Sequence, residues 1–317
     1  MKLEKRKIVI IGCGHVGVST AFCLINQGLC DEIALIDLNE EKVLGEVLHL
    51  SQSIEYMNRN THVKVGRYED CEDAQIVIIT ASVPTPQSGN DRLKMLEPSL
   101  NVMKSIITQI KEHHFDGHLI VVSNPVDLMS YYAYKLSGLP ANQVIGTGTT
   151  LDTARLKYFI AQKIQVDPRS VHAMVIGEHG DSEMIPWSTV RIGGKDIYSV
   201  VQDNQSRLGQ EPYQQMKKDT IQAGWEIFNR KGNTCYGIAS STVGIIRTIL
   251  HNENQILPVS TLLRGEYGQD DLFISVPAII DRSGVREIVE LRMTPQEQEE
   301  FNQSCQRLKS FYDLLNQ

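Results

Sequence analysis

The sequence predicts an α/β protein, in which a doubly wound parallel sheet is followed by an α+β domain. In the first half, short β-branched runs alternate with helical segments, a pattern typical of parallel strands joined by crossover helices. The second half ends instead in three β-rich runs and one helix. We place the boundary near residues 146–148, so that the expected domains are 1–147 and 148–317.

Composition limits the classes of function. The 317-residue chain is 41% hydrophobic and 22% charged, which is ordinary for a globular protein. Its net charge of −7 argues against nucleic acid or an anionic membrane as partner, because both require basic surface. The cysteines are scattered without a C-x-x-C pair, which indicates reduced thiols and argues against a zinc site. With no apolar run of membrane-spanning length and no signal-peptide pattern, we expect a soluble cytoplasmic protein.

A glycine motif follows the first predicted strand. A β-branched run over 7–11 leads directly into Gly12-Cys13-Gly14-His15-Val16-Gly17, and a helical pattern follows over 18–28. The next β-like run, 32–36, ends at Asp37. In this Rossmann-type frame the first glycine makes the turn, the second admits a pyrophosphate, and the third lets the helix pack on the strand. Asp37 can bind the adenosine ribose and repel a 2′-phosphate, which predicts NAD rather than NADP.

The rest of the predicted sheet places polar residues at its carboxyl edge. Asn124 directly follows a strand, on the edge where such sheets bind ligands. The loop 82–91 is rich in Pro, Gly and small polar residues and ends at Arg92. It is either an ordinary surface loop or a lid that brings the arginine to a substrate. The expected elements are a helix over 39–56, strands over 63–65, 75–80, 119–122 and 144–145, and a helix over about 97–113.

The helix predicted over 150–164 carries two charged residues near its start. Asp152 and Arg155 are three residues apart, so their side chains share one face of the helix. A local ion pair explains this spacing. A pocket explains it equally well, with the acid orienting a histidine and the guanidinium binding a carboxylate in a bidentate fork.

One histidine stands in a tight loop. A strand over 170–176 is expected to lead into Gly177-Glu178-His179-Gly180-Asp181. The glycines permit a sharp turn, and His179 at its tip can titrate near neutral pH and meet a substrate. A turn histidine bonded to a nearby carboxylate is the alternative. Beyond the loop we expect a hairpin over 187–197, a helix over 213–229, a second helix ending at His251, antiparallel strands over 259–263, 272–276 and 285–291, and a last helix from Pro295.

Together these motifs resemble the L-lactate and malate dehydrogenase family over almost the whole chain. The most specific pieces are the glycine motif with Asp37, the turn Asn124-Pro125-Val126-Asp127, the Asp152-Thr153-Ala154-Arg155 segment and the His179 loop. The resemblance implies that His179 gives a proton to the substrate carbonyl during reduction and that Asp152 orients its ring. It also implies that Arg155 binds the substrate carboxylate.

The resemblance assigns further residues to substrate and cofactor. Arg92 would arrive with the closing loop and polarise the carbonyl, while Asn124 and Thr234 would contact the substrate. Hydride would pass directly to or from NAD without a metal ion. The implied cofactor-binding residues are Gly12, Gly14, Val16, Gly17, Asp37, Lys42, Tyr68, Thr80, Ala81 and Asn124.

The loop decides which acid is expected. Malate dehydrogenases of this family carry an additional arginine there, whereas residues 83–91 contain no cation, so a second carboxylate would remain unpaired. We therefore expect a monocarboxylate, with pyruvate and L-lactate first. The loop is one residue longer than the lactate dehydrogenase pattern, and its substrate-binding Gln corresponds to Thr85, Pro86 or Gln87, of which we assign Gln87. Such a loop also resembles the L-2-hydroxyisocaproate dehydrogenases, which accept larger aliphatic oxo acids. A different class, the NAD-dependent glycosidases that share this fold, would need a metal site built from Cys and His.

A regulatory site and an assembly also follow from the resemblance. Many bacterial lactate dehydrogenases bind fructose 1,6-bisphosphate at a subunit interface through an Arg and a His. His172 matches the histidine, and Lys157 stands where the arginine is expected. Lysine keeps the charge but lacks the bidentate fork. The family also implies a homotetramer or a homodimer.

Overall fold

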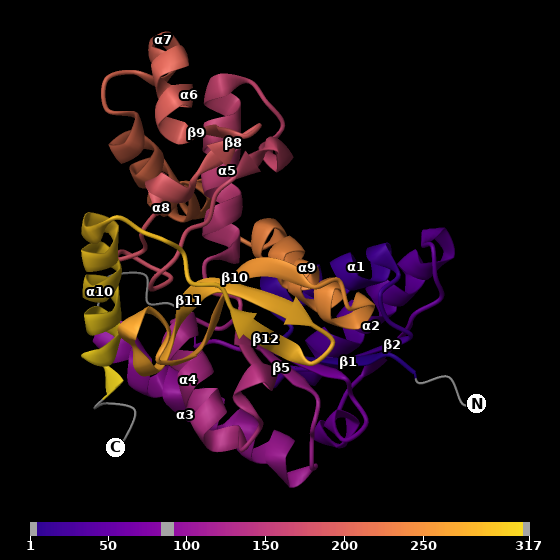
Figure 1. The fold of residues 1–317 in the computed structure, drawn as a ribbon. Coiled ribbons are helices and arrows are strands. Elements are labelled where there is room, and N and C mark those ends of the chain that lie inside the picture. The colour runs from indigo at the N-terminus through magenta and orange to yellow at the C-terminus, as the bar shows by residue number, and fades with distance from the viewer. Residues whose placement is uncertain (1–4, 84–91, 313–317) are drawn as a thin grey trace.

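The first half of the protein is a parallel sheet (Figure 1). The structure is a computed structural model that describes residues 5–83 and 92–312, the second range with side chains from Leu96 onward. Within this part of the chain, six strands lie in the order β3-β2-β1-β4-β5-β6, and their pairs are parallel. The predicted doubly wound sheet is thus confirmed, and its order reverses between β1 and β4, where such sheets bind ligands. The strands are β1 (Lys7–Ile11), β2 (Glu32–Ile36), β3 (His62–Val65), β4 (Ile76–Ile79), β5 (His118–Val121) and β6 (Val144–Gly146).

Strand β1 shows why the sheet is covered on both faces. All of its residues are buried. Ile8 and Ile10 belong to the core on one face, whereas Val9 and Ile11 belong to the core on the other. Because successive side chains point to opposite faces, an unbroken β-branched run is suited to a strand between two layers of helices. One layer contains α1 (His15–Gln27), α2 (Glu40–Ser53) and α9 (Tyr236–His251), and the other contains α3 (Arg92–Glu112) and α4 (Val126–Ser137).

The last strands of the chain extend the same sheet. Ser260 of β10 pairs antiparallel with Gly146 of β6. Strands β11 and β12 follow, which gives this sheet nine strands within the described residues. The sequence predicted three antiparallel strands here but not their attachment to the parallel sheet. This attachment protects the edge of β6, whose backbone groups would otherwise be unpaired. The bounds are β10 (Gln255–Arg264), β11 (Asp270–Asp281) and β12 (Gly284–Ile288).

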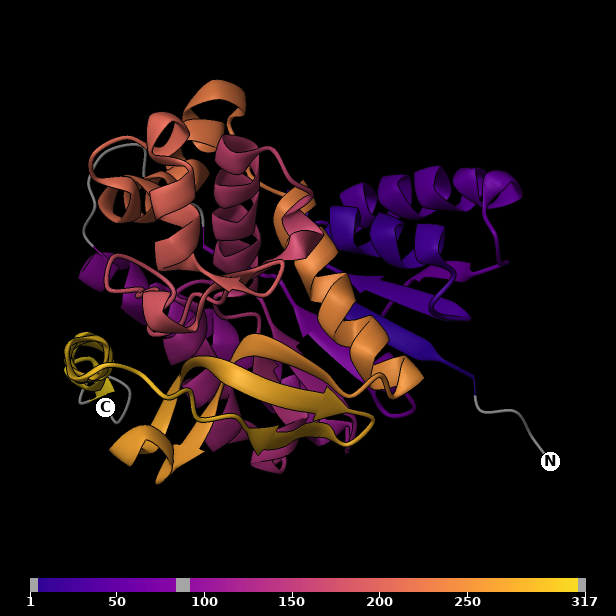
Figure 2. The ribbon, with the colours of Figure 1, turned by 45° about the horizontal axis from the view of Figure 1, so that its top comes forward.

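The remainder of the second half forms a helical layer with its own core. This layer stands above the sheet in Figure 1, and Figure 2 shows α5 and α8 side by side within it. Its core gathers around Leu156, Ile160, Val175 and Met216. The elements are α5 (Thr150–Ile164), β7 (Val171–His172), β8 (Arg191–Ile192), β9 (Lys195–Asp196), α6 (Ile197–Asp203), α7 (Gln205–Leu208) and α8 (Pro212–Lys231). The last helix, α10 (Pro295–Lys309), packs against β11.

The bounds of several predicted elements differ from the structure, and two of these differences bear on the site. The strand expected over 170–176 is reduced to β7, because the backbone beyond it bonds to side chains at the start of α5. The amide of Val175 donates to Thr153 Oγ1 at 2.9 Å, and Thr149 Oγ1 donates to the Val175 carbonyl at 2.5 Å. The helix expected from about residue 97 begins at Arg92 and continues through Pro98.

Two broader expectations concern the thiols and the membrane. The six cysteines are free thiols, which agrees with the expected reduced state. Burial raises the pKa of Cys13 to about 12, so this thiol, next to the predicted cofactor turn, is held in its neutral form. Among the described residues, each helix is either too short or too polar to cross a bilayer.

Candidate active site

The loop that carries His179 is closed by two backbone hydrogen bonds. The amide of Ile176 donates to the Met184 carbonyl at 2.9 Å, and the amide of Met184 donates back to Ile176 at 2.8 Å. Gly177, with φ +94°, turns the chain into the loop, and a Cβ at this position would lie 2.8 Å from Ser304 Oγ. The loop is therefore a tight turn held on the sheet rather than the end of a long strand.

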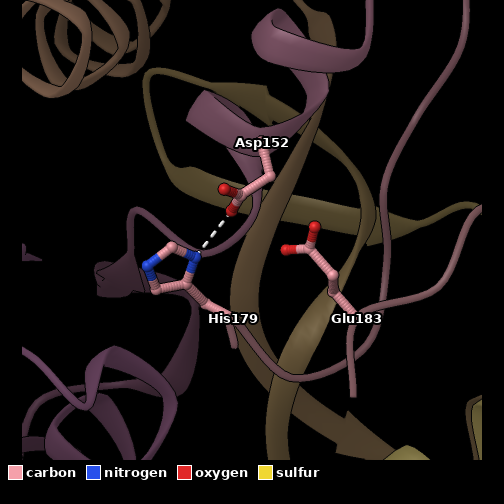
Figure 3. Close-up of side chains that lie close together, drawn as sticks. All are labelled: Asp152, His179 and Glu183. Atoms are coloured by element: carbon pink, nitrogen blue, oxygen red, sulfur yellow. Dashed lines mark hydrogen bonds and ion pairs between the residues drawn. The ribbon is translucent and has the colours of Figure 1, made fainter. Parts of the chain in front are cut away.

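His179 is fixed at both its backbone and its ring. Its backbone amide donates to Asp127 Oδ2 at 2.8 Å, and Nδ1 lies 2.6 Å from Asp152 Oδ2 (Figure 3). A carboxylate that accepts from Nδ1–H leaves Nε2 available for a substrate. The imidazole keeps 26% of its surface exposed, whereas the Asp152 side chain keeps only 3%. The structure thus pairs a partly accessible histidine with a buried acid, as the sequence predicted.

The charges of this pair support each other. Burial opposes the imidazolium, but the charge and hydrogen bond of Asp152 outweigh it and raise the pKa of His179 to about 9. Burial likewise opposes the charge of Asp152, yet His179 and Arg155 hold its pKa below the usual range. His179 is therefore protonated at neutral pH and can act as an acid.

Arg155 completes this arrangement. Its Nη1 lies 2.9 Å from Asp152 Oδ1, so the predicted i,i+3 pair forms. The guanidinium also lies against Gly224 of α8, where an added Cβ would meet Nη2 at 3.2 Å. Only one nitrogen is engaged with Asp152, so the other donors of the fork remain for a carboxylate. The local ion pair and the pocket, which were alternatives at the level of sequence, are compatible.

The two acids that flank His179 have another role. Arg307 of α10 forms ion pairs with Glu178 at 3.1 Å and with Asp181 at 3.5 Å. The backbone amide of Glu178 also donates to Ser304 Oγ of the same helix at 2.8 Å. These acids tie the loop to α10, and Asp152 is the carboxylate that holds the imidazole.

The predicted cofactor turn is closely packed. Gly12 has φ +103°, and a Cβ there would lie 2.4 Å from the Ala81 nitrogen. A Cβ on Gly17 would lie 2.0 Å from the Gly12 oxygen, so helix α1 approaches the turn only because both residues are glycine. Thr80 Oγ1 donates to that same Gly12 oxygen at 2.6 Å. Thr80 and Ala81 therefore border the glycine turn at the point where the strand order reverses.

Gly14 and Asp37 fit the two ends of a dinucleotide. A Cβ on Gly14 would meet no atom within 4 Å, and no side chain caps the start of α1, so a pyrophosphate can approach the helix N-terminus. Asp37 accepts hydrogen bonds from the amides of Cys13 at 2.6 Å and Asn39 at 3.1 Å. It is half-buried beside the turn, in the position of the acid that binds a ribose.

For most of the other predicted residues, the structure gives a location but no contact that bears on their predicted roles. Asn124 is exposed at the end of β5, and it lines a cavity of about 10 Å³ together with Ala81. Thr234 is half-buried between α8 and α9. Val16 and Tyr68 are half-buried and Lys42 is exposed, and their contacts with a cofactor remain predictions. Gln87 and the side chain of Arg92 lie outside the described part of the structure.

Sequence reasoning missed three residues of the site. Asp127 stands in one of the motifs, but the sequence does not indicate that it accepts from the His179 amide. Gly224 stands in none of the motifs. Glu183 brings a third ligand-type atom within 4.8 Å of those of Asp152 and His179. Because Asp152 and His179 are already bonded to each other, we interpret the trio as a proton-sharing group rather than a metal centre. No local pattern of residues indicates that Glu183 lies beside this pair.

Comparison with known proteins defines the class. Residues 6–146 match the lactate/malate dehydrogenase NAD-binding domain, and residues 149–315 match the lactate/malate dehydrogenase alpha/beta C-terminal domain. The chain therefore belongs to the lactate/malate dehydrogenase family and is an NAD-dependent oxidoreductase, as the sequence motifs implied.

Within this family, the chain is similar to proteins named L-lactate dehydrogenase. It is 46% identical to L-lactate dehydrogenase 3 of Bacillus anthracis over 315 residues, and this aligned region covers 99% of both chains. It is 45% identical to L-lactate dehydrogenase of Lactococcus lactis subsp. cremoris, over 99% of this chain and 100% of the relative. The solved structure of the ligand-bound minor L-lactate dehydrogenase from Enterococcus mundtii matches with a TM-score of 0.94 and 45% identity, over 98% of each chain.

Proposed function

We propose that this dehydrogenase is an L-lactate dehydrogenase that interconverts pyruvate and L-lactate. The observation that carries the proposal is the 2.6 Å hydrogen bond between His179 and Asp152, with the Arg155 guanidinium on the other carboxylate oxygen. This grouping supplies a proton donor and a guanidinium that can bind a substrate carboxylate. The reduction of a 2-oxo acid requires both functions.

The residues divide the chemistry between them. Asp152 accepts from Nδ1–H, so His179 gives the proton on Nε2 to the substrate carbonyl oxygen in reduction and takes it back in oxidation. Arg155 binds the substrate carboxylate and thereby sets the distance of the carbonyl from His179. NAD, when bound, supplies or accepts the hydride, and Gly14 and Asp37 would hold its pyrophosphate and ribose. Arg92, Asn124, Thr234 and Gln87 complete the proposed substrate contacts.

The experiment that tests this function compares three oxo acids by absorbance of NADH. We expect the highest kcat/KM with pyruvate, because the loop 83–91 contains no cation for a second carboxylate. Faster turnover of oxaloacetate would contradict the loop argument. Higher kcat/KM with 2-oxoisocaproate would favour the alternative, an L-2-hydroxyisocaproate-type dehydrogenase for larger aliphatic acids. The NAD-dependent glycosidase alternative is not supported, because the chain belongs to a dehydrogenase family.

The proposal extends to activation by fructose 1,6-bisphosphate. Lys157 of α5 is half-buried, and burial lowers its pKa, while no described carboxylate forms an ion pair with it. His172 of β7 is exposed. A phosphate bound between copies of these residues would supply the missing anion for Lys157. We expect the sugar bisphosphate to lower the KM for pyruvate, and K157A or H172A to abolish this effect while the unactivated rate is kept.

We further propose that the chain works as a homodimer or homotetramer in the cytoplasm. Apolar side chains are exposed on neighbouring helices, with Phe22 of α1 at 44%, Leu44 of α2 at 45% and Leu48 of α2 at 55%. An apolar surface of this kind is typical of subunit interfaces. Sedimentation velocity tests the assembly, and a monomer at micromolar concentration would contradict it. The cytoplasmic location is supported by the free thiols.

A further inference from the structure

Glu183 is buried beside the catalytic pair. It closes the loop that carries His179, since its amide donates to the Gly180 carbonyl at 3.2 Å and its neighbour Met184 pairs with Ile176. Only 3% of the residue is exposed. Figure 3 shows its carboxyl group directed toward Asp152 and His179. One of its carboxyl oxygens lies within 4.8 Å of a carboxylate oxygen of Asp152 and of a ring nitrogen of His179.

This carboxyl group lacks the partners that a buried carboxylate needs. Its Oε1 finds no hydrogen-bond partner in the part of the chain that the structure describes. An ionised carboxylate in such a place is costly, whereas the neutral acid is much less so. Burial and the nearby charge of Asp152 raise the pKa of Glu183 to about 9. Glu183 therefore carries a proton at neutral pH.

Charged groups from three elements face Glu183. Asp152 and Arg155 approach from α5, His179 lies on the same loop, and Lys217 approaches from α8. Asp152 favours the neutral acid, and the three cationic groups favour the ionised one. His179 in turn faces Asp127 of α4 as well as Asp152 and Glu183. The charges of Glu183 and His179 thus act on each other, so that ionisation of one changes the pKa of the other.

We propose that Glu183 is a positioning residue of the catalytic pair, whose buried carboxyl group ionises together with His179 and keeps His179 protonated to higher pH. The proposal rests on the proposed reduction of pyruvate, in which His179 must carry a proton. As pH rises, loss of the Glu183 proton leaves a negative charge near the imidazolium. That charge opposes loss of the second proton, the one that reduction consumes, so activity persists further into the alkaline range.

The experiment is the pH dependence of kcat/KM for pyruvate reduction in the full-length enzyme. Glu183→Gln keeps the size of the side chain but cannot ionise. We expect its alkaline limb to move to lower pH by about one unit relative to wild type. An unchanged limb, or a shift to higher pH, would overturn the proposal.

Asp181→Asn is the matched control. Asp181 lies two residues away on the same loop, and its side chain is 60% exposed, so its charge is largely screened by water. Its alkaline limb should coincide with that of wild type. A shift as large as that of Glu183→Gln would show that any charge on the loop has this effect, which would also overturn the proposal.

A second measurement needs neither turnover nor a folded variant. Infrared spectra of the wild-type enzyme, with and without ¹³C-labelled glutamate, detect the carbonyl stretch of a protonated glutamic acid. The label separates this band from any band of Asp127, the buried carboxyl group that also faces His179. We expect this band at pH 7 and its loss above about pH 9. Absence of the band at pH 7 would overturn the inference, whereas a wild-type enzyme that shows the band but reduces no 2-oxo acid would contradict only the proposed function.

Discussion

Two clusters of buried charge in this protein serve different purposes. The first surrounds Lys7 of β1, whose side chain is 6% exposed. Its ammonium lies 2.9 Å from Asp70 and 3.7 Å from Glu32, and Lys64 lies 2.6 Å and 3.3 Å from the same two acids. Burial opposes the charge of Asp70, but hydrogen bonds from Lys64 and Lys7 lower its pKa to about 2. Each charge in this cluster has an opposite charge beside it.

The second cluster surrounds His179 and is not balanced in this way. Asp152 lies between Arg155 and His179, but Glu183 has an oxygen without a partner in the described residues. Burial and the charge of Asp152 raise the pKa of Glu183 to about 9, and pairing with Asp152 outweighs burial and raises the pKa of His179 to about 9. Opposite charges thus hold Asp70 in its ionised form over a wide pH range, whereas Glu183 can change its protonation state near pH 9. The first cluster joins β1, β2 and β3 by ion pairs, and the second is the one that we propose to transfer a proton.

The most direct way to break the catalytic cluster is His179→Asn. We expect kcat for pyruvate reduction to fall by about 10²- to 10⁴-fold, because the proton donor is lost. Binding of NADH, followed by its fluorescence, should change little, since the cofactor turn is built from other residues. Turnover close to that of wild type would contradict the mechanism.

Lys7→Met is the corresponding test of the paired cluster. The substitution removes one of the positive charges beside Asp70 and Glu32. We expect the free energy of unfolding, measured in urea, to fall by about 3–5 kcal/mol. The folded variant should keep the wild-type kcat/KM, because Lys7 does not belong to the active site. A large loss of kcat/KM at full folding would show that the two clusters are not separate in function.

Asp152→Asn tests the second cluster through the pH dependence of activity and of stability. Without the carboxylate, the pKa of His179 should fall from about 9 toward its unperturbed value, so the alkaline limb of pyruvate reduction should move to lower pH by one unit or more. The raised pKa of His179 contributes stability that is present below about pH 6.5 and is lost as pH rises to about 9. The stability difference between wild type and variant should therefore narrow across that window in urea titrations at several pH values.

Arg155→Lys should have the smallest effect of the four. The charge beside Asp152 is kept, but the fork that binds a carboxylate in two parallel hydrogen bonds is lost. We expect the KM for pyruvate to rise by about 10-fold, corresponding to one charged hydrogen bond, with a smaller change in kcat. A KM equal to that of wild type would argue against Arg155 as the substrate anchor.

The residues of the proposed catalytic pair could be singled out because they stand in local patterns. Asp152 and Arg155 are three apart on one helix, and His179 lies between glycines, so spacing and turn chemistry indicated both before their contact was known. The contact itself, between α5 and a loop 27 residues away in sequence, followed from the family resemblance. Arg92 was predicted as the end of a loop and is the first residue of α3, since polar residues at a helix start resemble those of a loop.

Sequence by itself determined the elements whose signals are short-range. The β-branched run of β1, the glycine turn with Asp37, and the helix that begins before Asp152 each follow from periodicity or from a few neighbouring residues. Tertiary structure alone decided what depends on distant partners. It joined β10 to β6, replaced the end of a predicted strand by bonds to Thr149 and Thr153, and buried Glu183 beside His179. Burial and pairing across the fold set the protonation of a carboxyl group, and no local pattern of residues encodes them.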